Sequence, residues 1–188
     1  MAIDNLSPAN VTIFNISEDE TQSVKPADGR YGNIKIVIYD GKHIPAGDAE
    51  FDLLVCNSVL EHVPTELRTA LVSEMKRVAR HVFIQTPAYE FPVEPHFIMP
   101  FVHWLPRQTG FWLVHFSPWR LISRPTAKTI ASYYWGTRLL TRRELSALFP
   151  DETIEQEKFL GMVKSHYVIS SLSKSSGNRP TLTKPPLA

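Results

Sequence analysis

The chain of 188 residues has little of several features that mark whole classes of protein. Its single cysteine, Cys56, excludes an internal disulfide, and its place in an apolar run favours a buried structural thiol over a nucleophile. No apolar run approaches the roughly 18 residues that a membrane-spanning helix needs. Residues 1–10 lack the basic start and apolar core of a signal peptide. We therefore expect a protein of a reducing, cytoplasmic setting.

An excess of charge of either sign is also missing. The chain has 20 Lys and Arg and 19 Asp and Glu, a net charge of +1, which gives no reason to expect nucleic acid as a partner. Hydrophobic residues make up 43%, as in ordinary globular proteins, and the length fits one domain. Residues 173–188 have hardly any apolar side chains, so we predict a domain over residues 1–172 and a disordered tail after it.

The middle of the chain has the pattern of a β-α-β unit. Residues 53–56 form a short apolar run, which predicts a strand buried on both faces, and the polar pair Asn57-Ser58 marks its end. Apolar residues then recur at helical spacing between Pro64 and Arg80, and a second apolar run follows at 82–85. Ligands of such sheets bind at the carboxyl ends of the strands, so we expect a site beside Asn57 and Ser58.

Further elements flank this unit and predict an α/β fold. Residues 11–14 and 34–39 are β-branched runs that end in Asn15 and in Asp40-Gly41, respectively. Toward the C-terminus, residues 140–149 predict a helix, which is capped by Thr141. Two last strands, at 153–159 and 167–171, are expected to pair in antiparallel fashion.

The segment 89–135 differs from the rest because it holds all four tryptophans and many prolines. Since it follows the strand at 82–85, we expect it to lie over the carboxyl edge of the sheet. It is either a lid over a substrate or a second small core of helices. A third interpretation is peripheral contact with a membrane through residues 97–135, where basic side chains suit anionic headgroups. These basic residues are Arg107, Arg120, Arg124 and Lys128.

Seven short motifs, taken in order, resemble those of class I S-adenosylmethionine-dependent methyltransferases with a type 11 methyltransferase domain. They are Asp40-Gly41, Ile44-Pro45, Phe51-Asp52, Leu60-Glu61-His62-Val63, Gln85-Thr86-Pro87, Glu94-Pro95-His96 and Leu139-Leu140-Thr141. Each is weak alone, but their order and spacing over residues 11–170 are fairly specific. The resemblance implies a Rossmann-like, mostly parallel sheet with a C-terminal antiparallel hairpin, and S-adenosylmethionine as the cofactor.

The resemblance also implies which residues contact that cofactor. Asn15 stands where the family has an acidic residue for the ribose hydroxyls, and Asp40 with Gly41 falls near the adenine. Asn57 and Ser58 fall beside the methionine part. Asp40-Gly41 and Asn57-Ser58 also have plainer interpretations, because Asp-Gly is a common turn and the polar pair could simply satisfy the turn into the helix.

The chain departs from the family at one element. The family's first strand is central in the sheet and ends in a glycine-rich turn, whereas this chain has no Gly-x-Gly and only ten residues before Val11. The resemblance thus implies an N-terminally incomplete sheet, with a gap between the strands at 11–16 and 52–57. Either the sequence is a truncated product, or a partner chain completes the sheet, or the cofactor site is degenerate. A non-catalytic module that acts by protein interaction is therefore the alternative function.

Methyl transfer from a sulfonium needs alignment of the reactants and, for some acceptors, removal of a proton. The candidate bases are His62 and the pair Glu94 and His96; each also has a structural interpretation. The predicted reaction is methyl transfer to a small-molecule or a lipid- or saccharide-linked acceptor. No metal site is predicted, because the spacing of the histidines in segment 89–135 fits no tetrahedral pattern and no cysteine joins them.

Overall fold

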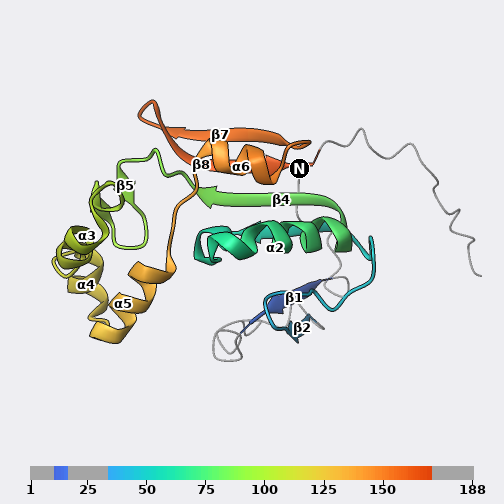
Figure 1. Cartoon of the computed structure of the whole chain (residues 1–188), viewed down its shortest axis with the longest axis horizontal. Helices are drawn as coiled ribbons and strands as arrows, with labels where there is room; N and C mark the ends of the chain where they lie inside the picture. The colour runs from blue at the N-terminus through green and yellow to red at the C-terminus, as the bar shows by residue number, and fades with distance from the viewer. Residues whose placement is uncertain (1–10, 17–33, 171–188) are drawn as a thin grey trace, which may run out of the picture.

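The computed structural model describes residues 11–16 and 34–170, which form a sheet lobe and a helical lobe (Figure 1). The sheet lobe contains strands β1 (Thr12–Asn15), β2 (Lys35–Ile38), β3 (Phe51–Asn57), β4 (Ala79–Pro87), β7 (Thr153–Phe159) and β8 (Met162–Ile169), the turn η3 (Leu60–His62), and helices α2 (Thr65–Val78) and α6 (Arg142–Leu148). The helical lobe, residues 89–136, contains β5 (Val93–Glu94), β6 (Met99–Pro100), η4 (Val102–Trp104), α3 (Arg107–Val114), α4 (Pro118–Ser123) and α5 (Ala127–Gly136). The predicted tail at 173–188 lies outside the described residues.

The central sheet has the strand order β3-β4-β8-β7. Strands β3 and β4 are parallel, whereas β8 pairs antiparallel with both β4 and β7, so the chain closes with the expected hairpin. The last strand begins earlier than predicted: β8 starts at Met162, whereas the sequence predicts a strand at 167–171. Helix α6 begins at Arg142 and is capped by Thr141, whose side chain forms a capping box with Glu144. The α/β class and the C-terminal hairpin are confirmed.

Helix α2 covers one face of this sheet because its apolar residues recur every three or four positions. Leu71, Met75 and Val78 are buried and belong to one core with Val82 and Ile84 of β4. Full burial of such a side chain contributes roughly 1.5–3 kcal/mol. Helix α2 is the crossover between β3 and β4. It ends at Val78, the chain enters β4 directly at Ala79, and β4 therefore runs parallel to β3.

The opposite face of β3 is open. The side chains of Leu53 and Val55 point to this face and are 54% and 61% exposed. The prediction that this strand is buried on both faces is therefore wrong. A parallel strand with one bare face is unusual, because parallel sheets are normally covered on both sides.

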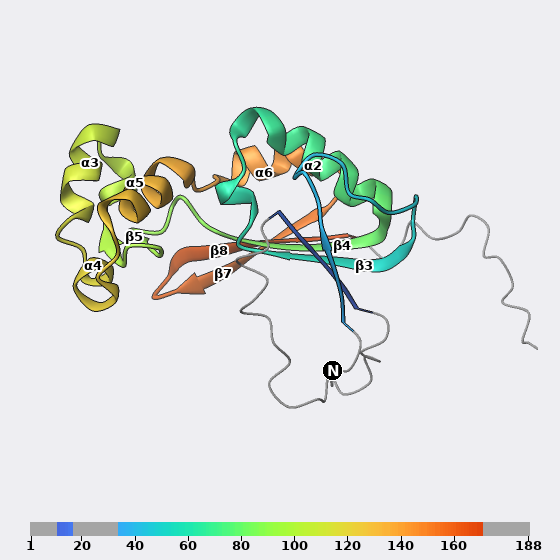
Figure 2. The ribbon, with the colours of Figure 1, turned by 90° about the horizontal axis from the view of Figure 1, so that it is seen from below.

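Strands β1 and β2 form a separate parallel pair. Among the described residues no backbone ladder joins β1 to β3, and Figure 2 shows the pair running across β3 rather than beside it. The rings of Phe14 and Phe51, 5.7 Å apart, make a contact between the two sheets. Within residues 11–16 and 34–170, the gap that the sequence predicts between these strands is present.

The helical lobe has an apolar core of its own. This core consists of Phe97, Val102, Val114, Ile130 and Tyr134. The segment thus contains the second helical core that its composition suggests, while its roles as a lid or membrane contact stay predictions. In the described part of the chain, no helix is both long and apolar enough to cross a bilayer.

Candidate functional site

The carboxyl ends of β3 and β4 meet at the edge of the sheet that faces the helical lobe (Figure 2). Ser58, directly after β3, has a backbone φ of 53°, a left-handed conformation that residues other than glycine rarely adopt. Its backbone N–H donates to the Gln85 carbonyl at 3.0 Å, and its hydroxyl donates to the Gln85 side chain at 2.9 Å. Non-glycine residues held in this conformation cluster at binding sites, so this conformation of Ser58 indicates a binding site at the strand end.

A cavity of about 690 Å³, here called the sheet-edge cavity, opens at this strand end. Asn57, Ser58 and Gln85 line its polar side, and Val55 and Phe83 line its apolar floor. Hairpin β5–β6 contributes further wall residues, and β8 contributes Tyr167. The volume is in the range of small-molecule and cofactor sites, roughly 300–1,000 Å³. The structure thus brings together two of the predicted cofactor residues, Asn57 and Ser58.

The other predicted cofactor residues lie on or just after the separate β1–β2 pair: Asn15 ends β1, and Asp40 and Gly41 follow β2. The Asn15 side chain accepts a hydrogen bond from the Ile16 N–H at 2.7 Å. One carboxylate oxygen of Asp40 accepts from the N–H groups of His43 and Lys42, and these bonds lower the pKa of Asp40. Gly41 follows with a φ of 74°, as the turn requires. The lining of the sheet-edge cavity does not include these residues.

The candidate bases are brought together from two distant parts of the sequence. His62 lies on η3, directly after β3, and His96 lies in the loop between β5 and β6. Their ring centroids are 4.8 Å apart, edge to face. His96 Nδ1 lies 2.7 Å from one oxygen of Glu94, whose other oxygen accepts from the Phe97 N–H at 2.8 Å. The predicted pair is thus a formed hydrogen bond that also fixes the turn of the hairpin.

Burial and charge act in opposite directions on His96. Burial disfavours the imidazolium, but the hydrogen bond to Glu94 and the charges of Glu94 and Glu61 outweigh it and raise the pKa of His96. Glu94 itself is buried. A buried carboxylate behind an imidazole is the arrangement that orients a general base and stabilises its protonated form.

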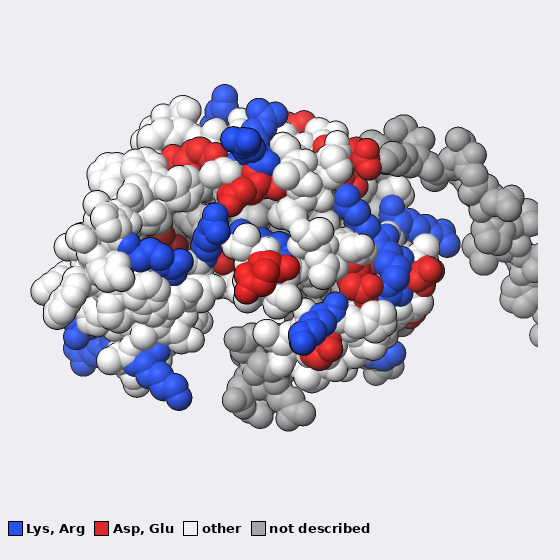
Figure 3. All heavy atoms as spheres, viewed as in Figure 1, with Lys and Arg blue, Asp and Glu red and all other residues white. Residues whose placement is uncertain are grey.

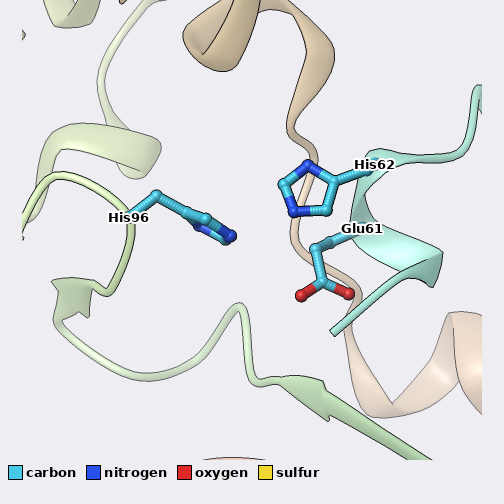
Figure 4. A group of neighbouring side chains, drawn as sticks. All are labelled: Glu61, His62 and His96. Atoms are coloured by element: carbon cyan, nitrogen blue, oxygen red, sulfur yellow. The ribbon is translucent and has the colours of Figure 1, made fainter. Parts of the chain in front are cut away.

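Glu61 is the residue of this site that the sequence prediction missed. It is fully buried, and one of its carboxylate oxygens accepts from the Thr86 hydroxyl at 3.0 Å. Burial raises its pKa, against the opposing effects of the Thr86 bond and of nearby positive groups. Figure 4 shows Glu61 beside His62 and across from His96. The sequence contains one signal for Glu61, because it is an acidic residue in a largely apolar stretch, directly before the candidate base His62.

A second cavity, of about 350 Å³ and here called the insert cavity, lies between this site and the helical lobe. Its lining residues include Glu94, Phe97, Arg107, Tyr134, Thr137, Arg138 and Glu144. Hairpin β5–β6 separates the two cavities, because Val93, Pro95 and Ile98 line the sheet-edge cavity whereas Glu94 and Phe97 line the insert cavity. The hairpin that carries His96 is therefore shared between them.

The chain passes back across the site between α5 and α6. The Thr137 hydroxyl lies 3.2 Å from His62 Nδ1, and the Arg138 N–H donates to the Glu61 carbonyl at 2.7 Å. The Arg68 guanidinium of α2 donates to the Arg138 carbonyl at 2.8 Å. These bonds hold residues 137–141, a segment that joins the two lobes, against η3.

Comparison with known proteins supports the fold. Residues 1–82 match the family model described as the methyltransferase domain, and no curated protein matches the chain. A S-adenosylmethionine-dependent methyltransferase of Methanosarcina mazei is 15% identical with a TM-score of 0.50, and the match covers 85% of this chain and 80% of that one. A protein of Pyrococcus horikoshii is 12% identical with a TM-score of 0.52, over 85% and 70% of the two chains. At these identities, the likeness to solved structures concerns the fold.

Proposed function

We propose that this chain, which contains a class I S-adenosylmethionine-dependent methyltransferase domain, transfers a methyl group to a small-molecule or lipid- or saccharide-linked acceptor held beside the helical lobe. The observation that supports this acceptor position is the hairpin β5–β6, whose residues line both cavities and which carries the hydrogen-bonded pair of Glu94, a lining residue of the insert cavity, and His96. The sheet-edge cavity would hold the cofactor and the insert cavity the acceptor.

Bound S-adenosylmethionine supplies a methyl group that is already activated on a sulfonium sulfur. Asn57 and Ser58 would hold its methionine part, since both line the sheet-edge cavity. Asp40, Gly41 and Asn15 do not line this cavity, and their proposed contact with the adenosine rests on the family resemblance alone. The protein then has to position the acceptor and exclude water, which is where most of the rate enhancement of such a transfer originates.

His96 is the proposed base for an acceptor hydroxyl or amine. Glu94 orients the imidazole through Nδ1, which leaves Nε2 to take the proton that the acceptor loses. His62 is the second candidate, because its ring lies edge to face with that of His96.

Cofactor binding is the direct test of this proposal. Isothermal titration of the chain with S-adenosylmethionine and with S-adenosylhomocysteine should show one site. Replacement of Asp40 by alanine should weaken binding about tenfold, the value of one hydrogen bond to a charged group. Asp52→Ala is the matched control, because Asp52 is exposed at the amino end of β3, away from the strand ends that form the site. No heat and no thermal shift at millimolar ligand would count against independent activity.

The helical lobe supports a peripheral membrane contact and, with it, a lipid-linked acceptor. Trp112, Phe116, Leu121 and Ile122, on and between α3 and α4, are each more than 70% exposed. Between Glu94 and Glu144 the chain has seven Lys and Arg and no acidic residue. Figure 3 shows Lys and Arg side chains at the end of this lobe beside a broad uncharged surface. Exposed aromatic and aliphatic side chains with basic neighbours suit the surface of an anionic bilayer.

The bare face of β3 favours a second candidate function, a non-catalytic module whose sheet a partner chain completes. Leu53 and Val55 leave an exposed apolar surface on a strand that pairs, among the described residues, only with β4. Open strand edges and apolar faces tend to pair with another chain.

Self-association is the simplest form of this second function. If two copies pair along β3, Val55→Asp should convert the dimer to a monomer, because it places a charge in the interface. Sedimentation or light scattering would measure this, with Leu160→Asp in the β7–β8 turn, an exposed apolar residue away from β3, as the matched control. A protein that is monomeric at all concentrations and binds the cofactor would contradict the second function.

A further inference from the structure

We propose that Glu61, His62 and His96 bind one divalent transition-metal ion at the junction of the two lobes. One ligand atom from each of the three lies within 4.8 Å of the others. Figure 4 shows them approaching one another from η3 and from the β5–β6 loop. Two imidazoles and one carboxylate are a donor set typical of catalytic zinc and of non-haem iron, and they leave coordination positions open.

The buried carboxylate of Glu61 is the independent observation that points to an ion. The whole residue is 0% exposed, and only one of its oxygens is bonded to Thr86. The other oxygen, Oε1, is buried and has no hydrogen-bond partner among the described residues. A buried polar group without a partner destabilises the fold, and buried charges are paired or coordinate metals. An ion at the cluster would satisfy this oxygen.

Both imidazoles already have the partners that metal-bound histidines usually have. His96 Nδ1 faces the Glu94 carboxylate at 2.7 Å, and His62 Nδ1 faces the Thr137 hydroxyl at 3.2 Å. When Nδ1 is held by an oxygen in this way, Nε2 serves as the ligand atom, and the carboxylate or hydroxyl fixes the ring orientation. Glu94 is itself fixed by the Phe97 N–H.

The spacing is close to that of a bound site. Ligand atoms on one tetrahedral zinc ion are about 3.3 Å apart, given bonds of about 2.0–2.1 Å. The three side chains would therefore move together by about 1–1.5 Å on binding, given those bond lengths. His62 is exposed and lies at the end of η3, so its side chain can make this movement without displacing the core.

The ion would join the sheet lobe to the helical lobe next to the insert cavity, because Glu94 and Thr137 line that cavity. An acceptor hydroxyl bound at the open position would pass its proton to solvent water more readily, as metal-bound water does, and its oxygen would then take the methyl group with S-adenosylhomocysteine as the leaving group. In that state His96 would be a ligand, and the ion instead of the imidazole would activate the acceptor. This role rests on the proposed methyl transfer, whereas metal binding itself does not. The proposal departs from the sequence prediction of no metal site, which considered only the histidines of one segment.

The test is metal binding by the full chain, stripped with a chelator and freed of any histidine tag. Isothermal titration with zinc chloride and absorption spectra with cobalt chloride should give one ion per chain. His62→Ala and His96→Ala should each lower the affinity at least about 100-fold, and Glu94→Gln about 10- to 100-fold, as for other partners of metal-bound histidines. His115→Ala is the matched control, since this histidine is bonded to the Phe111 carbonyl within α3 and lies outside the cluster.

Several outcomes would overturn the proposal: no binding below millimolar zinc, an unchanged affinity in His62→Ala, or an equal loss in His115→Ala. Circular dichroism shows whether each variant is folded. If His96→Ala does not fold, the zinc affinity of His62→Ala decides between the outcomes, because His62 is exposed. Metal binding without any effect of the chelator on methyl transfer would refute only the activating role. Loss of cofactor binding, by contrast, would refute the methyl transfer and leave the metal site standing.

Discussion

Replacement of His96 by alanine is expected to lower kcat/KM for methyl transfer by about 10²- to 10⁴-fold, the usual contribution of a positioned proton acceptor. The loss follows from geometry, because the Glu94 carboxylate holds this imidazole at 2.7 Å in the hairpin between the two cavities. The measurement is formation of S-adenosylhomocysteine from S-adenosylmethionine with a panel of phenols, sugars and isoprenoid alcohols as acceptors.

The dissociation constant for S-adenosylmethionine should stay unchanged in this variant, since the cofactor residues lie elsewhere. Glu94→Gln should give a smaller loss, because the amide can still accept from the Phe97 N–H but does not stabilise a charged imidazole. His115→Ala should behave like the parent protein. A loss of similar size in His115→Ala, or full activity in His96→Ala, would show that the Glu94–His96 pair only shapes the hairpin.

Replacement of Leu121 and Ile122 by glutamine is expected to weaken binding to anionic vesicles at least about tenfold, because burial of each side chain contributes roughly 1.5–3 kcal/mol. Both lie on α4 and are 71% and 77% exposed. The basic residues of the lobe add about 1 kcal/mol each near a charged surface, so binding should also fall as salt is raised. Co-sedimentation with phosphatidylglycerol-containing vesicles measures the effect.

Leu160→Gln is the matched control for this experiment. Leu160 is 82% exposed, but it lies in the β7–β8 turn of the sheet lobe. Its replacement should leave vesicle binding unchanged. Equal binding of parent and double variant, or equal affinity for neutral and anionic vesicles, would contradict a membrane contact through α4 and favour a protein partner for this surface.

Elements with a strong local pattern were predictable from the sequence. Helix α2 follows from the spacing of Leu71, Met75 and Val78, and α6 from the cap at Thr141. The C-terminal hairpin and the parallel pair β3–β4 follow from apolar runs separated by a turn or by a helix. These features depend on neighbours in the chain, so periodicity and capping residues suffice.

Burial was less predictable, because it depends on what covers a surface. An apolar run reads as a fully buried strand, yet Leu53 and Val55 of β3 are exposed on the face away from α2. Sequence alone records that side chains are apolar, and a second layer of structure decides whether they are covered.

The candidate site was predictable in part. The Glu94–His96 contact follows from a spacing of two residues around Pro95, and the strand end at Asn57-Ser58 follows from the β-α-β pattern. Asn15 and Asp40 were placed through a resemblance, and their part in the site stays a prediction. Glu61 was missed because an acidic residue in a short turn is usually solvated, and only the packing of η3 against Thr86 buries it.

The sequence by itself determined the α/β class, the β-α-β unit and the carboxylate beside His96. The tertiary structure alone decided that His62 and His96 lie with their rings 4.8 Å apart, that Glu61 is buried beside them, and that one hairpin separates two cavities. The physical reason is that periodicity and capping act between residues close in sequence. The site, in contrast, joins η3 to a loop more than 30 residues later, and that approach depends on how the helical lobe packs.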